Sequence, residues 1–262
     1  MIAVVCGTRE GREIASLLVE KGFECIALTT TEYGKRLAGE SGVEVISGNF
    51  TGEKLNTIFS EKDIKTVVDV SHPFAHREAK LLKKLCDEKQ INYIRYLREE
   101  TEIPENSLIH PVTSWQEAAE YAGRLGNTIF LTTGSHNLEE FLEYIDLNKK
   151  RVIVRVLPDH KIIKKCQDLG FAPKDIVAMQ GPFSKQMNRW TFKMYNASVV
   201  ITKDSGKAGG TDTKVSAALD LKIPVVVIKR PFMQQGKTVR TYDEVLQFLR
   251  EQSDQNSKQM RS

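Results

Sequence analysis

The loop after the first apolar run could bind an anion. The chain opens with "MIAVV", continues with Cys6-Gly7-Thr8-Arg9-Glu10-Gly11, and then becomes amphipathic. Gly7 would let the backbone approach a ligand, and the N–H groups opening the next helix would attract a phosphate. The pattern is not G-x-G-x-x-G, so phosphate binding and an ordinary strand-to-helix turn remain equal alternatives from spacing alone. Glu10 would turn outward or hold a ribose hydroxyl.

A histidine follows a later apolar run, because Ser71-His72-Pro73 comes directly after "TVVDV". Ligands of open α/β sheets bind beyond the carboxyl ends of the strands, so His72 is well placed for a site. Pro73 would preset a helical turn, and Ser71 would cap the helix. The alternative is a partly buried histidine beside a capped helix. The sequence leaves open whether His72 would transfer a proton or only form hydrogen bonds.

Three loops in the second half are rich in glycine and polar side chains. They read "TTGS" at 132–135, "QGPFS" at 180–184 and "TKDSGKAGGTDTK" at 202–214. The last is not a P-loop, because G-x-x-x-x-G-K-[ST] is absent. Its Lys203, Lys207 and Lys214 would still suit carboxylate or phosphate groups. Three such loops at neighbouring strand ends are hard to explain as turns alone.

The loop after the second apolar run does not decide between NADH and NADPH. An acidic residue at this place usually holds the ribose of NAD, whereas an arginine favours the phosphate of NADP. Here the run ends in Thr29-Thr30-Thr31, and Glu32, Lys35 and Arg36 follow shortly after. A solvated helix start explains these residues equally well.

Composition excludes several other classes of protein. The 262 residues are 40% hydrophobic with a net charge of +4, which is typical of a soluble globular protein and gives no indication of nucleic-acid binding. No G-x-S-x-G elbow or membrane-length apolar run is present. His72 and His76 have an i, i+4 spacing that a metal could use, but no third ligand is evident. The four cysteines are far apart, and we expect buried free thiols. With no signal-peptide pattern, a cytoplasmic enzyme without a protein-bound metal is expected.

Strand-like and helix-like runs alternate along the chain, which predicts an α/β fold with doubly wound, mainly parallel sheets. The predicted strands are 2–6, 24–28, 43–46, 66–70 and 92–96, then 128–132, 151–156, 176–179, 198–202 and 224–228. The predicted helices are 11–21, 33–40, 51–60 and 75–89, then 114–124, 160–169, 184–195, 211–220 and 242–252.

The charged, proline-containing stretch "LREETEIPENSLIHPVTSWQEA" interrupts this alternation and indicates a domain crossing. We therefore expect a domain over 1–98 and another over 99–252. The last residues, 253–262, have almost no apolar content and are expected to be disordered.

An ordered set of segments resembles the precorrin-6A and cobalt-precorrin-6A reductases of cobalamin biosynthesis. The segments are "CGTREGREIA", "TTEYG", "VVDVSHPFA", "YIRYLRE", "FLTTGSHNL", "RVLP", "MQGPFS", "TKDSGKAGGTDTK" and "IPVVVIKRP". The resemblance spans nearly the whole chain. It implies two Rossmann-like domains with the active site in the cleft between them. It also implies reduction of a macrocycle double bond in precorrin-6A, with or without chelated cobalt, to the 6B product by hydride from NADH or NADPH.

With this resemblance, the first half would hold the cofactor and the second half the tetrapyrrole. The cofactor residues would be Gly7, Thr8, Glu10, Gly11, Arg12, Thr30, Tyr33, Ser71 and Pro73, with His72 as a proton donor or positioning residue. The macrocycle would lie against Thr132, Thr133, Gly134, Gln180, Ser184, Lys203, Ser205 and Gly206. Nucleic-acid and membrane partners are not expected. The alternatives are another NAD(P)H reductase with two such domains and a non-catalytic α/β protein that binds a small ligand.

Two residues depart from the family pattern. Cys6 stands where glycine is common, and Asp204 stands where asparagine is common. Cys6 would crowd the first turn slightly. Asp204 would add negative charge near a polycarboxylate, which Lys203 and Lys207 would offset.

Overall fold

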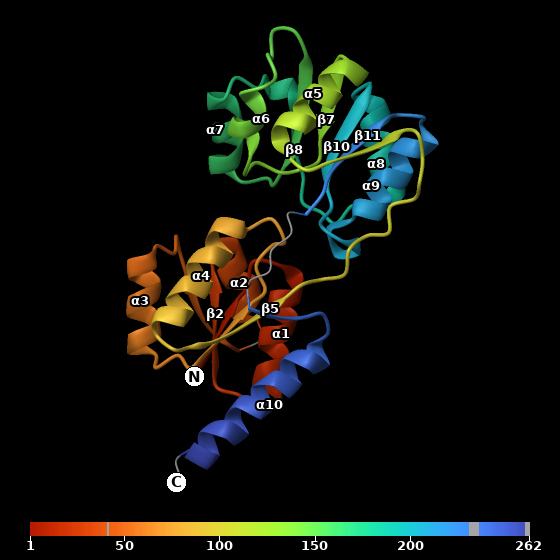
Figure 1. Cartoon of the computed structure of the whole chain (residues 1–262). Coiled ribbons are helices and arrows are strands. Elements are labelled where there is room, and N and C mark those ends of the chain that lie inside the picture. The colour runs from red at the N-terminus through yellow and green to blue at the C-terminus, as the bar shows by residue number, and fades with distance from the viewer. Residues whose placement is uncertain (41, 231–235, 260–262) are drawn as a thin grey trace. The chain divides into compact units, whose positions relative to one another are not determined.

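The computed structural model describes residues 1–40, 42–230 and 236–259. It separates into two compact units (Figure 1). The first unit combines Met1–Arg98 with the C-terminal segment of the chain, and the second is formed by Glu99–Pro231. Within the described residues, no helix combines the length and apolar character that a membrane span requires.

The first unit is built on a sheet in which all pairings are parallel. Its strands are β1 (Ile2–Val5), β2 (Cys25–Thr29), β3 (Glu44–Ser47), β4 (Thr66–Asp69), β5 (Asn92–Tyr96) and β12 (Lys237–Val239). They lie in the order β12-β5-β4-β1-β2-β3. Its helices are α1 (Arg9–Glu20), α2 (Glu32–Gly39), α3 (Gly52–Glu61), α4 (His76–Glu88) and α10 (Tyr242–Gln259).

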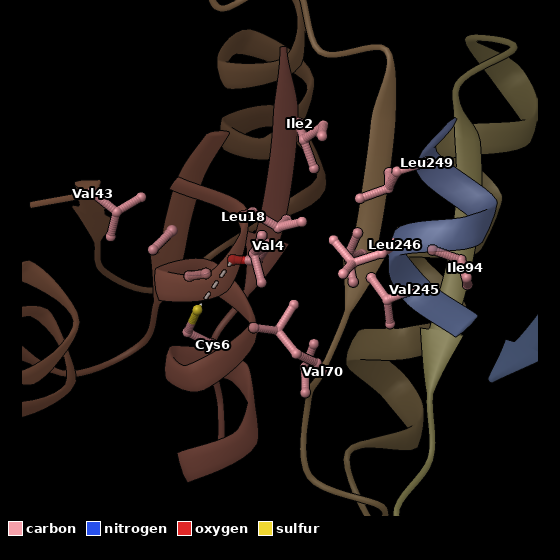
Figure 2. Packing of buried hydrophobic residues seen from close by; sticks show 14 of the residues in the cluster. Ile2, Val4, Cys6, Leu18, Val43, Val70, Ile94, Val245, Leu246 and Leu249 are labelled. Carbon is pink, nitrogen blue, oxygen red and sulfur yellow. Dashed lines mark hydrogen bonds between the residues drawn. The ribbon is translucent and has the colours of Figure 1, made fainter. Parts of the chain in front are cut away.

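Helices cover both faces of this sheet. Successive residues of a strand point to opposite sides, so each strand packs against both helix layers. On one face Val4 packs with residues of α1 and α10, including Leu18, Leu246 and Leu249 (Figure 2). On the other face, Ala3 lies in a cluster that includes apolar residues of α3 and α4. The strands are therefore apolar on both sides, as expected for a buried parallel sheet.

The second unit repeats this plan. Its strands are β6 (Ile109–Val112), β7 (Thr128–Leu131), β8 (Arg151–Val156), β9 (Ile176–Ala178), β10 (Val199–Lys203) and β11 (Val225–Ile228). They form a parallel sheet in the order β6-β11-β10-β7-β8-β9. Its helices are α5 (Trp115–Leu125), α6 (Leu138–Leu142), α7 (His160–Asp168), α8 (Lys185–Met194) and α9 (Thr211–Asp220), with short 3-10 turns η1 (Pro173–Asp175) and η2 (Lys207–Gly209). The predicted α/β class with parallel sheets is confirmed.

The C-terminal segment differs from the expected domain boundary, which placed all of 99–252 in one domain. β12 pairs with β5, and Val245, Leu246 and Leu249 of α10 enter the core of the first unit. Local patterns could not show this, because the pairing joins segments far apart in the sequence. α10 also extends to Gln259, beyond the start of the tail that we expected to be disordered; residues 260–262 lie outside the described residues.

The predicted crossing contains a strand that the sequence did not reveal. β6 lies within it and, among the described strands, pairs with β11 alone, so it is an edge strand. Pro111 is tolerated there because an edge strand needs hydrogen bonds on one side only. The short elements β12 and α6 were also not predicted, since three to five residues give too little periodicity.

Candidate functional site

The first sheet has a switch point between β1 and β4. From β1 the chain proceeds to β2 and β3 on one side, whereas β4 and β5 lie on the other side. Loops that leave neighbouring strands in opposite directions open a crevice where ligands of such sheets bind. The two loops are close here: a Cβ on Gly7 would lie 3.3 Å from Ser71 Cα and 3.4 Å from the backbone nitrogen of His72. The structure thus brings Gly7, Ser71 and His72 together.

The β1–α1 loop is held by a cap and by a close approach of backbone. Thr8 is the N-cap of α1: its hydroxyl accepts from the Gly11 N–H at 3.3 Å and donates to the Val70 carbonyl at 3.1 Å. A Cβ on Gly11 would lie 2.8 Å from Cys6 Cα, so the strand and helix can meet only if this residue is glycine. Close packing of helix on strand is what the last glycine of a dinucleotide loop provides. Arg12 is half-buried, and its Nη1 donates to the Thr8 carbonyl of the same turn at 3.4 Å.

Cys6 is accommodated by the core and does not crowd the loop. Its side chain is buried among apolar residues (Figure 2), and its Sγ donates to the Gly11 carbonyl at 3.2 Å. Burial raises the pKa of this thiol to about 12. Cys6 is therefore a packing residue and not a nucleophile. Cys86 and Cys166 are also buried and free, but Cys25 is only partly buried, which corrects that part of the prediction.

Glu10 neither points outward nor stands alone. Its Oε2 accepts from Arg98 Nη2 at 2.7 Å, and the two side chains are only 10% and 11% exposed. Arg98 follows β5, so the pair joins the start of α1 to the other side of β4. Nothing in the sequence indicated this ion pair.

The β4–α4 loop is arranged differently from the prediction. α4 begins at His76, so Ser71 is not its cap, and residues 72–75 form a turn. The Phe74 N–H donates to His72 Nδ1 at 3.2 Å. Pro73 is buried, and the Ser71 hydroxyl is buried without a hydrogen-bond partner among the described residues. A ligand hydroxyl or amide at the switch point would satisfy it.

A buried polar group supports this loop and was missed from the sequence. The carboxylate of Asp69, which is fully buried, accepts from the Ser71 N–H at 2.9 Å and from the Tyr93 hydroxyl at 2.6 Å. Arg95 Nη1 lies 3.7 Å from the same carboxylate. Burial and the neighbouring Asp69 raise the pKa of Tyr93. The charged residues in "TVVDV" and "NYIRY" were the available signal, since a charge inside a buried strand needs a partner.

The loop after β2 is exposed. Thr31 caps α2, Thr30 is solvent-exposed, and the Arg36 guanidinium lies 5.6 Å from the ring centre of Tyr33. The Ser47 hydroxyl donates to Glu32 Oε1 at 2.6 Å. A shallow hollow of about 430 Å³ lies beside α2, lined by Glu32, Lys35, Arg36, Gly39, Val43 and Val45. It is not at the switch point, and its polar lining belongs to the β2–α2 region.

The second sheet has a matching switch point between β7 and β10. The β7 loop contributes Thr132, whose hydroxyl donates to the Ile201 carbonyl at 3.0 Å, and Thr133, whose buried hydroxyl has no partner among the described residues. It continues through Gly134, at a φ of +74°. On β10, Lys203 Nζ donates to Asn137 Oδ1 at 2.9 Å and lies 5.1 Å from the Trp115 ring centre.

The loop after β10 is a compact turn. Ser205 is buried, and its N–H donates to Thr211 Oγ1 at 3.1 Å. Gly206 has a φ of +79°, a conformation that favours glycine. Asp204 accepts from the Thr101 N–H at 3.4 Å and lies 3.9 Å from Arg230 Nη2. Arg230 is therefore a cation beside Asp204 that the sequence did not indicate, and the offset by Lys203 and Lys207 stays a prediction.

Three cations around this switch point are poorly solvated. Burial lowers the pKa of Lys203 to about 8 and that of Arg155 to about 10. Lys214 is partly buried, and burial together with Arg155 and Lys203 lowers its pKa to about 7, although Asp212 opposes this. Arg155, which the sequence analysis missed, stacks on Phe183 at 3.9 Å from the ring centre, and its Nη1 donates to Asn188 Oδ1 at 2.8 Å.

Gln180 and Ser184 lie elsewhere, after the edge strand β9. Both are exposed, and the Ser184 hydroxyl caps α8 by accepting from the Met187 N–H at 3.1 Å. Phe183 links this loop to the cations through its stack on Arg155. Among the described residues, no cluster of His, Cys, Asp or Glu could hold a metal ion.

Comparisons with known proteins agree with this architecture. The family model described as Precorrin-6x reductase CbiJ/CobK matches residues 1–250. The cobalt-precorrin-6A reductase of Priestia megaterium is 35% identical over 95% of this chain and 98% of its own length. The enzyme of the same name from Methanothermobacter thermautotrophicus is 36% identical over 95% of this chain and 85% of its own length.

A more distant relative, the precorrin-6A reductase of Rhodobacter capsulatus, is 22% identical over 95% of each chain. A solved structure named CobK precorrin-6A reductase superposes with a TM-score of 0.77 at 21% identity, covering 95% of this chain and 96% of its own, and so supports the fold. The full-length family match and the relatives above 30% identity decide the assignment: this chain belongs to the CbiJ/CobK precorrin-6x reductase family.

Proposed function

We propose that this chain reduces one double bond of the precorrin-6A macrocycle, in its metal-free or cobalt form, to give the corresponding 6B product. Hydride would come from NADH or NADPH. The family match supports the reaction, and the names of the relatives support the substrate. Cobalt, where present, belongs to the substrate.

The cations around the second switch point are the observation that carries the proposal. Burial disfavours the charged forms of Lys203, Lys214 and Arg155, and the Arg155 Nη2 has no hydrogen-bond partner among the described residues. Acetate and propionate groups of a tetrapyrrole would add negative charge beside these cations and favour their charged forms. The unpartnered Thr133 hydroxyl at the same strand ends would donate to a carboxylate or a ring substituent.

The first switch point fits a nicotinamide cofactor, which supplies the hydride when bound. Gly7 allows close approach of the backbone, and the first N–H groups of α1 face the end of the helix, where anions bind. Gly11 lets α1 lie close to β1, and Thr8 fixes the cap. Ser71, His72 and Pro73 border the nicotinamide end, where the buried Ser71 hydroxyl would gain a partner.

In this arrangement His72 positions the reacting groups. Its Nδ1 accepts from the Phe74 N–H, so the neutral ring carries its proton on Nε2 and can donate a hydrogen bond from there. The proton that completes the reduction would come from water or from the substrate itself. The loop after β2 would choose the cofactor, through Glu32 toward a ribose hydroxyl or through Lys35 and Arg36 toward a ribose phosphate.

The deciding test is an anaerobic assay of precorrin-6A and of its cobalt form, each with NADH and with NADPH. We expect oxidation of one cofactor coupled to a shift in the tetrapyrrole spectrum. The variant Lys203→Met should raise the KM for the tetrapyrrole at least 10-fold while the Kd for the cofactor changes less than 2-fold. Exposed Lys193 on α8 provides the matched control, since Lys193→Met should change neither constant.

The same assay separates the alternatives. Cofactor binding without turnover of either tetrapyrrole would indicate a reductase for another substrate. Tetrapyrrole binding without oxidation of either cofactor would indicate a binding protein. No spectral change in any of the four combinations would overturn the proposed reaction.

A further inference from the structure

We propose that Arg98 sets the affinity for the anionic cofactor by balancing the charge of Glu10 at the start of α1. The inference rests on the proposed function, because it assumes that a nicotinamide cofactor binds at the first switch point. Arg98 would then be a positioning residue that lies outside the glycine loop. Glu10 would be the partner of Arg98 and would not bind a ribose hydroxyl.

Glu10 lies where a negative charge is unfavourable for such a cofactor. It is in the first turn of α1, directly after the N-cap Thr8 and Arg9. The pyrophosphate of a dinucleotide binds at this end of the helix. Glu10 is 10% exposed, so water and salt screen its carboxylate weakly. An unpaired carboxylate here would repel the phosphates.

The pair with Arg98 removes this repulsion. Arg98 Nη2 donates to Glu10 Oε2 at 2.7 Å, and the Arg98 side chain is 11% exposed. A short, charge-assisted hydrogen bond between two poorly solvated groups is strong and directional. The net charge that this pair presents to a bound phosphate is close to zero.

The other charged side chains at this end of α1 have different partners. Arg9 Nε donates to Glu13 Oε1 at 2.7 Å, with the Arg9 side chain 76% exposed. Glu13 also accepts from the Tyr242 hydroxyl at 2.6 Å. Arg12 Nη1 donates to the Thr8 carbonyl at 3.4 Å. Within the described part of the chain, the side chain that donates to the Glu10 carboxylate is Arg98.

The position of Arg98 brings it to the binding crevice. Arg98 follows β5, Glu10 follows β1, and β4 lies between these two strands. The ion pair therefore crosses the carboxyl end of β4, where Ser71 and His72 begin the second loop of the crevice. If Glu10 loses its charge, no carboxylate at this place opposes a bound phosphate, while the positive charge of Arg98 stays nearby.

This arrangement predicts effects of opposite sign for the two partners. With Arg98→Gln, the uncompensated Glu10 should weaken cofactor binding about 10-fold or more. With Glu10→Gln, the loss of a negative charge beside the phosphates should tighten binding about 3-fold or more. The double variant Glu10→Gln/Arg98→Gln should return to within about 3-fold of the parent chain. Arg98→Lys keeps the charge and should also stay within about 3-fold.

The measurement is the Kd of NADH and of NADPH without tetrapyrrole, from nicotinamide fluorescence at several NaCl concentrations, with a thermal melt of each variant. Both single variants break the same ion pair and should lower the melting temperature similarly, so stability cannot produce opposite effects on Kd. Because the Glu10 carboxylate is poorly exposed to salt, most of the difference in Kd between Arg98→Gln and the parent should persist as NaCl is added. Arg9→Gln, which removes an exposed cation, is the control and should change Kd less than 2-fold.

Equal weakening in both single variants without recovery in the double variant would overturn the inference and leave a purely structural pair. An unchanged Kd in Arg98→Gln would overturn it as well. If the parent chain bound neither NADH nor NADPH, the proposed function itself would fail, and this inference with it. Binding by the parent with no difference among variants would reject only the role of Arg98.

Discussion

His72 illustrates how one backbone hydrogen bond limits the chemistry of a side chain. The Phe74 N–H donates to Nδ1, so the neutral ring would have to become an imidazolate to release its Nε2 proton. The variant His72→Asn keeps a side-chain acceptor for the Phe74 N–H. We expect kcat to fall less than about 10-fold, against ~10²–10⁴-fold for a lost general acid.

The measurement is kcat of the parent chain and of the His72→Asn variant between pH 6 and pH 9. A loss above about 100-fold, with the disappearance of a titrating limb in the profile, would show that His72 donates the proton after all.

Lys214 should make tetrapyrrole binding depend on pH. Its pKa is lowered to about 7, chiefly by burial and also by Arg155 and Lys203, with Asp212 opposing. A lowered pKa means that the ammonium is charged below pH 7 and loses its proton as pH rises. Because carboxylates bind the charged form, the KM for the tetrapyrrole should be lowest near pH 6 and rise up to about tenfold per unit above pH 7.

The corresponding variant is Lys214→Arg, whose guanidinium stays charged throughout this range. Its KM should vary less than 3-fold between pH 6 and pH 9. A parent KM that is flat over the same range would show that Lys214 does not bind the substrate.

At the scale of elements, the contact between β1 and α1 depends on Gly11. A Cβ there would lie 2.8 Å from Cys6 Cα, and backbone cannot yield as a flexible side chain can. Gly11→Ala should lower the free energy of unfolding by ~1–3 kcal/mol and raise the Kd for the cofactor, because α1 must move away from β1. Urea unfolding and a cofactor titration measure the two effects.

Gly123, inside α5, is the matched control. A Cβ there would meet the Ile145 side chain at 3.6 Å, which is ordinary contact. Gly123→Ala should stabilise the chain by ~0.5–1 kcal/mol, since alanine favours the helix. Equal effects of the two substitutions would contradict the proposed close approach.

The adjacent strands β4 and β5 are joined by the buried pair of Asp69 and Arg95. These residues are 0% and 3% exposed, and Asp69 also holds the Ser71 N–H. Asp69→Asn leaves Arg95 as an uncompensated buried charge, so the free energy of unfolding should fall by ~3–5 kcal/mol. Denaturant unfolding gives this value.

The exposed pair of Asp63 and Lys65 offers the comparison, with side chains 77% and 62% exposed. Asp63→Asn should change the free energy of unfolding by less than about 0.5 kcal/mol, and asparagine suits the φ of +46° at this position. A loss below about 1 kcal/mol for Asp69→Asn would mean that Arg95 finds another partner or water.

At the scale of the whole molecule, the C-terminal segment completes the first unit. β12 pairs with β5, and Val245, Leu246, Phe248 and Leu249 are buried in the same core as β1. Each such side chain contributes ~1.5–3 kcal/mol by burial, so together they match the net stability of a domain. A chain ending at residue 230 should lose the folded first unit and keep the second.

Limited proteolysis with mass spectrometry tests this, because a fragment of 99–230 should survive while 1–98 is degraded. A chain ending at residue 252 is the control and should resist like the full chain. Survival of 1–98 in the shorter chain would show that β12 and α10 add little to the stability of the first unit.

The sequence predicted the strands and helices that repeat at regular intervals, because a buried strand and an amphipathic helix each impose a local pattern. It also predicted which loops would follow the carboxyl ends of the strands, and so proposed Gly7, His72 and Lys203 as candidate site residues. It did not find β6, because Pro111 is read as a break unless the strand is known to lie at a sheet edge.

What the sequence determined by itself was the α/β class, the family resemblance and the loops that could bind ligands. Only the tertiary structure showed that Glu10 pairs with Arg98, that Asp69 binds the Tyr93 hydroxyl, and that β12 and α10 belong to the first unit. The physical reason is that these contacts join residues distant in sequence, whose side chains meet only after parallel strands have aligned their carboxyl ends. A local sequence pattern carries no information about contacts between distant residues. The partner of a charged residue is therefore decided by the tertiary structure.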